Sequence, residues 1–84
     1  MGDISDQDST TFVEVQAILS RYCISDIDDS SDPKYYGFLD KDGNWYILKS
    51  TTGTSFRYSK GSTGYTTNWT NRAGLTYNYF DVVF

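Results

Sequence analysis

Residues 35–49 read YYGFLDKDGNWYILK, and this stretch decides the fold of the chain. Two aromatic-rich runs flank an Asp-Gly pair at Asp42 and Gly43. Such a pair is among the strongest short-range signals for a β-hairpin, because a tight turn needs a positive φ that glycine adopts without steric cost. The pattern predicts one strand over about residues 35–40 and an antiparallel partner over about residues 45–49.

Toward the C-terminus, alternating side chains extend this hairpin into a meander. A third strand is predicted over about residues 56–60, where the aromatic residues Phe56 and Tyr58 alternate with the polar residues Arg57 and Ser59. Residues 61–74 form a long loop rich in Gly, Ser, Thr and Asn, and residues 75–80 form a fourth strand. The expected fold class is mainly β, with a small α+β fold as the alternative. It is an antiparallel meander of about four strands, preceded by an N-terminal helix or extended arm.

The N-terminal third contains a short amphipathic element and a linker. Residues 12–24 (FVEVQAILSRYCI) fit either a helix or a strand, as short apolar runs often do. The candidate assembly arm is its helical face: Phe12, Val15, Ile18 and Leu19. Residues 25–34 (SDIDDSSDPK) form a linker, because Ser, Asp and the one proline interrupt the periodicity. The predicted division is therefore an acidic arm over residues 1–33 and an aromatic-rich antiparallel β domain over residues 34–84.

Charge is distributed unevenly between these two parts. Residues 1–33 hold eight acids and one base, a net charge of −7, whereas residues 34–84 hold six bases and three acids, a net charge of +3. This asymmetry suggests complementary contact within a protomer or between protomers. The overall charge of −4 argues against nucleic acid as a partner. No apolar run approaches the ~20 residues that span a bilayer, so no membrane partner is expected.

The composition also restricts the chemistry. The chain has no histidine, which removes the commonest general base and metal ligand and every Ser/His or Cys/His dyad. The single cysteine, Cys23, excludes an intramolecular disulfide and a zinc site built on cysteines. Because Cys23 follows an apolar run, we expect it to be a small buried hydrophobic residue. We expect no enzyme activity and no cofactor.

Two groups of acidic residues resemble metal sites without completing one. The turn DKDGN imitates the start of an EF-hand loop, but Trp45 stands in place of its turn glycine and Thr51 in place of its bidentate glutamate. We therefore predict a hairpin turn there. The second group is Asp26, Asp28, Asp29 and Asp32. We interpret it as a solvated linker or as partners for basic groups, and we expect no metal site.

Candidate binding residues gather in and beside the predicted loop: Tyr65, Trp69, Arg72 and Tyr77. Exposed aromatic rings with an arginine can stack on a sugar, which would make this a glycan site. In the alternative, Trp69 closes the small core or a subunit contact and Arg72 pairs with an acid. The sequence leaves both interpretations open.

Several motifs occur together in the C-terminal two thirds of the chain: Tyr36-Gly37-Phe38, Asp42-Gly43-Asn44-Trp45-Tyr46-Ile47, Tyr58-Ser59-Lys60-Gly61, Trp69-Thr70-Asn71-Arg72-Ala73 and Tyr77 to Phe84. As a set, they make the segment from about Tyr35 to Phe84 resemble small uncharacterised proteins encoded by tailed bacteriophages. The resemblance implies a phage-encoded virion component, made in the host cytoplasm. No catalytic role carries over from it.

These observations together predict a non-enzymatic bacteriophage virion structural protein. It would act through protein–protein assembly contacts on the tail, adaptor or fibres, or as capsid decoration. Its expected partners are further copies of itself, as a homo-oligomer, and other virion proteins. The alternative function is a carbohydrate-binding module that recognises glycans on the host surface.

Overall fold

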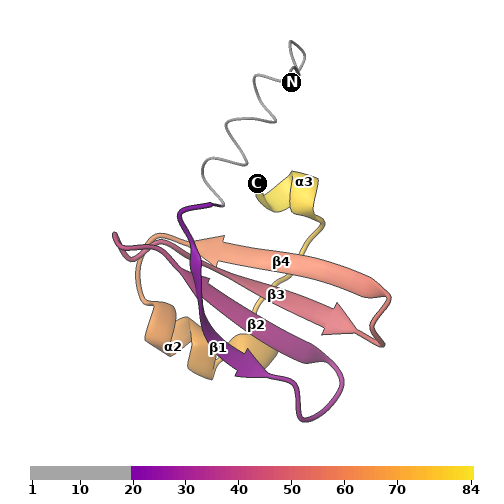
Figure 1. The fold of residues 1–84 in the computed structure, drawn as a ribbon. Coiled ribbons are helices and arrows are strands. Elements are labelled where there is room, and N and C mark those ends of the chain that lie inside the picture. Colours follow the sequence, from indigo (N-terminus) through magenta and orange to yellow (C-terminus); the bar gives the residue numbers. More distant parts are fainter. Residues whose placement is uncertain (1–19) are drawn as a thin grey trace, which may run out of the picture.

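The structure is a computed structural model that describes residues 20–84. Its centre is a single four-stranded antiparallel sheet in the order β1-β2-β3-β4, with each strand paired to the next along the chain (Figure 1). The strands are β1 (Cys23–Asp28), β2 (Lys34–Leu39), β3 (Trp45–Thr51) and β4 (Ser55–Gly61). The predicted antiparallel meander of four strands is confirmed.

The central hairpin, β2 and β3, forms as the Asp-Gly signal predicts. Gly43 adopts φ 90° in the turn. The Asp40 carboxylate accepts hydrogen bonds from the backbone N–H groups of Asp42 and Asn44 at 2.8 and 2.9 Å, and from the Asn44 side-chain amide at 2.9 Å. These three hydrogen bonds hold the Asp40 carboxylate against the turn that follows it. The prediction of a hairpin turn is therefore confirmed.

The first strand lies where the sequence predicts a linker, so that prediction is wrong as far as Asp28. Paired side by side with β2, the strand places Asp26 and Asp28 on one face of the sheet and Ile24 and Ile27 on the other. A bulge between Ile24 and Asp26 interrupts the alternation that would have revealed a strand. The sheet thus begins before residue 34, and the predicted boundary falls inside it.

The predicted fourth strand over residues 75–80 is also wrong. In that stretch only Asn78 pairs with the sheet, through an isolated bridge to Tyr58 with N···O distances of 2.8 and 2.9 Å. The chain then turns into α3 (Phe80–Val83). The predicted loop over residues 61–74 contains two short helices, α2 (Tyr65–Thr70) and η1 (Arg72–Gly74). None of the helices in residues 20–84 is long and apolar enough to cross a membrane.

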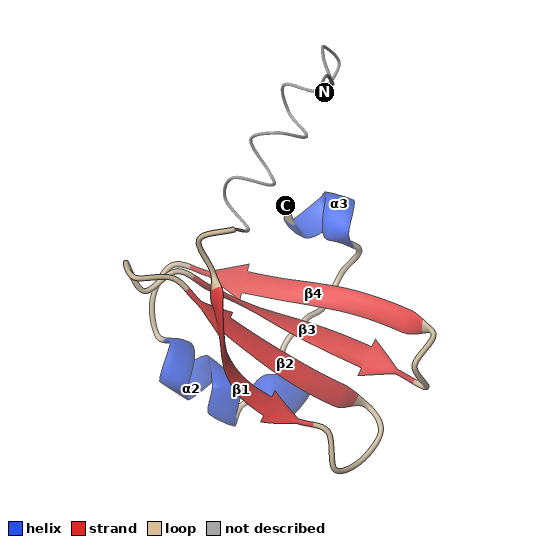
Figure 2. Ribbon diagram, viewed as in Figure 1, coloured by secondary structure: helices blue, strands red, loops and turns tan. Residues whose placement is uncertain are grey.

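The core lies between the sheet and α2, which covers one face of the sheet (Figure 2). The buried apolar residues are Tyr35, Trp45, Ile47 and Tyr65. Gly37 permits this close packing, because any Cβ there would collide with the side chains of Tyr65 and Trp69. We call this side of the sheet the covered face. At the C-terminus, α3 packs against β4 on the opposite side (Figure 1).

Candidate interaction surface

The predicted binding residues lie on the covered face, where they tie the C-terminal segment to the edge strand β1. The Tyr65 hydroxyl donates a hydrogen bond to the Asp26 carboxylate at 2.7 Å, and the Tyr65 side chain is buried. The Arg72 guanidinium donates to the Asp28 carboxylate through Nε at 3.1 Å and Nη2 at 2.8 Å. Asp32 accepts from the backbone N–H of Thr52 at 2.7 Å. Three of the four clustered acids therefore have partners within the protein.

The rings of this group are also packed against protein atoms. The Trp69 ring stacks on Tyr65 with centroids 6.2 Å apart, and the Arg72 guanidinium lies 4.5 Å from the Trp69 centroid. The Tyr77 hydroxyl donates to the Arg72 carbonyl at 2.8 Å. Tyr65, Trp69, Arg72 and Tyr77 are thus brought together, in an arrangement that closes the core. A glycan site remains a prediction, and a sugar stacking on Trp69 would compete with both neighbouring groups.

Burial extends to higher pH the range over which Tyr65 and Tyr77 stay neutral. Burial, together with the hydrogen bond to Asp26, raises the pKa of Tyr65 to about 12. Burial likewise raises the pKa of Tyr77 above its ordinary value. Both phenols are therefore hydrogen-bond donors over the ordinary pH range, which is the state that their contacts to Asp26 and to the Arg72 carbonyl require.

Acid is expected to destabilise the fold through Asp28. The hydrogen bond from Arg72 holds the pKa of Asp28 below its usual value. A depressed pKa contributes stability above the unfolded-state pKa of about 3.9, and that stability is lost as pH falls through the folded pKa. We expect Asp28→Asn to have a lower Tm than wild type at neutral pH, and the difference to close as pH falls through the lowered folded-state pKa of Asp28. Thermal melts across this range test it.

Asp29→Asn is the matched control for this measurement, because it removes the same charge one residue away at an exposed position. Its Tm should follow that of wild type at every pH. A Tm difference for Asp28→Asn that stayed constant from neutral to acid pH would contradict the role assigned to the ionised pair. Asp40 is expected to add to the acid sensitivity, because its hydrogen bond from the Asn44 side chain holds the pKa of Asp40 low.

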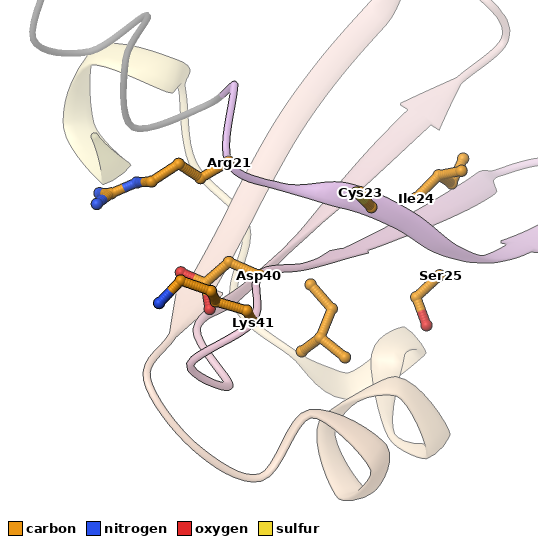
Figure 3. A pocket seen from close by; sticks show the side chains of 7 residues that line it. Arg21, Cys23, Ile24, Ser25, Asp40 and Lys41 are labelled. Atoms are coloured by element: carbon orange, nitrogen blue, oxygen red, sulfur yellow. The ribbon is translucent and has the colours of Figure 1, made fainter.

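An open hollow of about 380 Å³ lies at the start of β1, beside the β2–β3 turn (Figure 3). Its lining includes Cys23, Asp40 and Lys41. Cys23 is exposed, so the prediction of a buried cysteine is wrong; it lies on an edge strand with only β2 beside it. The Asp40 carboxylate already accepts three hydrogen bonds from Asp42 and Asn44 in the turn. Within residues 20–84 no group of three or more Cys, Asp or Glu side chains is placed to hold a metal ion.

The opposite side of the sheet, which we call the open face, carries a continuous set of apolar side chains from all four strands. The pairing registers place eight of them there: Ile24, Ile27, Tyr36, Phe38, Tyr46, Leu48, Phe56 and Tyr58. None of the eight is buried, and Ile24, Ile27 and Phe56 are 53%, 57% and 47% exposed. Part of this apolar set is therefore open to solvent in residues 20–84.

Aromatic rings on the open face pack against one another, and these contacts restrict their orientations. Phe38 stacks on Tyr46 with centroids 4.5 Å apart, and Tyr22 meets Tyr46 edge-on at 5.0 Å. At one corner the ring of Phe84, directly after α3, lies with its centroid 5.3 Å from that of Tyr46 and 6.1 Å from that of Tyr58. Aromatic rings held by such contacts lose little side-chain entropy when a partner covers them, which suits them to a protein interface.

The open face was not predicted, although the sequence contains a signal for it. Consecutive apolar residues in YYGFL and WYIL place apolar side chains on both sides of the hairpin. The predicted assembly arm, Phe12, Val15, Ile18 and Leu19, lies outside the described residues. Of the element left open between helix and strand, Cys23 and Ile24 are strand and residues 12–19 are not described.

No protein-family model, curated protein or solved structure matched the chain.

Proposed function

We propose that the protein is a non-enzymatic structural component that works through protein–protein contacts made by the open face. The observation that supports this most directly is the asymmetry of the sheet. Its covered face is closed by α2, while the open face presents eight apolar residues, none of them buried. Apolar patches of this kind mark interaction surfaces, and removing them from water stabilises an assembly. The resemblance of residues 35–84 to phage proteins makes a virion the proposed setting.

Copies of the chain are the first partner to test. We expect the purified wild-type protein to associate, with a solution mass by light scattering above the 9.6 kDa of one chain. The double variant Ile27→Asp with Phe56→Asp should reduce the mass to that of one chain, because two carboxylates would have to be desolvated in the interface. Both positions are exposed, so circular dichroism of the variant should match wild type.

Thr66→Asp is the control, since it adds a carboxylate at an exposed position of α2 on the covered face. It should leave the mass unchanged. A wild-type protein that remained a monomer at every concentration, or an oligomer indifferent to the double variant, would overturn the proposal.

A further inference from the structure

The charged residues that the strands place on the open face are all basic. In the pairing register, Lys34 lies on this face at the start of β2, and Lys60 lies near the end of β4. The Lys60 ammonium is 5.0 Å from the Phe84 ring centroid, so it stays at the margin of the apolar area. Among the described strand residues of this face there is no Asp or Glu. The charged strand residues of this face are thus both lysines, and such a surface favours an apolar segment that carries acids.

The chain itself contains a segment of that chemistry. Residues 1–19 hold four acids and no base, a net charge of −4, whereas residues 20–84 hold seven acids and seven bases, a net charge of zero. The apolar residues of residues 1–19 gather at their end, in FVEVQAIL over residues 12–19, with Glu14 among them. The sequence therefore supplies an acidic amphipathic segment whose charge complements the open face.

The described part of the chain begins beside the open face. Tyr22 packs against Tyr46 on this face, and only Ser20 and Arg21 separate Tyr22 from Leu19. A residue spans at most ~3.6 Å of chain, so Leu19 cannot lie farther than roughly 11 Å from Tyr22. A connection of two residues leaves little chain for folding the segment back onto its own sheet. Short hinges of this kind favour exchange of the segment between copies.

We propose that the open face is covered by residues 12–19 of a second copy, in a reciprocal exchange between two chains. The inference rests on the proposed function, because it names the occupant of the same face. Phe12, Val15, Ile18 and Leu19 would pack on the part of the face that α3 leaves uncovered. Glu14 and the acids before it would lie near the lysines at its margin.

Mixing two variants that each fail to assemble tests the exchange. Val15→Asp with Ile18→Asp disables the segment but keeps the face, and Ile27→Asp with Phe56→Asp disables the face but keeps the segment. We expect wild type at twice 9.6 kDa and each variant alone at 9.6 kDa. An equimolar mixture should return to twice 9.6 kDa, because one intact segment then meets one intact face.

Inserting a flexible Gly-Ser linker between Leu19 and Ser20 gives a second readout. The longer hinge lets the segment reach its own face, so the inserted protein should have the mass of one chain and the thermal stability of wild type. If the segment variant still assembles alone, the open faces of two copies pack on each other, and the exchange is wrong while the proposed function stands. If wild type never exceeds one chain, the proposed function itself fails.

Discussion

Ile47→Ala is expected to lower the free energy of unfolding by about 3 kcal/mol. Ile47 is 0% exposed and lies on β3 opposite Gly37 of β2 and Ser59 of β4. Its neighbours in the core are largely aromatic, so rigid rings cannot collapse into the space left by the lost methyl groups. Urea denaturation followed by circular dichroism measures the change.

The size of the residual cavity sets the effect, so Ile47→Val should cost only about 1 kcal/mol. Val82→Ala is the control outside the core, because Val82 is 63% exposed in α3. It should change the free energy of unfolding by less than about 0.5 kcal/mol. Equal effects for Ile47→Ala and Val82→Ala would mean that the layer between the sheet and α2 is not the main source of stability.

The fold was predictable where local rules agree with tertiary packing. The Asp-Gly turn and the alternating residues of the hairpin determined β2 and β3 to within about two residues, as turn chemistry and strand periodicity reinforce each other there. β1 was missed because two of its residues on the covered face, Asp26 and Asp28, look like linker residues. They tolerate a strand only because Tyr65 and Arg72 satisfy their carboxylates. Those partners come from residues 39 and 44 positions away.

The candidate surface was less predictable than the fold. The exposed-looking loop residues Tyr65, Trp69 and Arg72 turned out to pack on the covered face, because α2 places positions 65 and 69 one helical turn apart on its sheet side. Sequence periodicity gives the two sides of a strand but does not say which side a later helix covers. The choice is made by Gly37, whose missing Cβ leaves room for the Tyr65 and Trp69 side chains.

Gly61→Ala is expected to lower the free energy of unfolding by about 2–3 kcal/mol, because Gly61 lies in close contact with the Trp45 ring. Gly61 faces Trp45 across β3 and β4, and an added Cβ would lie 2.5 to 2.9 Å from three atoms of the indole ring. The ring is 4% exposed, and its Nε1–H donates to the Thr63 carbonyl at 2.7 Å. To accept a methyl group, the indole must move and weaken this bond. Urea titration measures the loss of stability, and Trp fluorescence should shift to the red.

Gly74→Ala separates crowding from the general effect of replacing a glycine. No atom lies within 4 Å of a Cβ built on Gly74, and its φ lies outside the left-handed region. The change should therefore be neutral or stabilise by up to about 1 kcal/mol, because alanine restricts the unfolded chain. If Gly61→Ala also left the free energy of unfolding unchanged, the Trp45 ring could not lie against Gly61 of β4. The covered face would then be packed differently from the arrangement that leaves the open face as the protein's apolar surface.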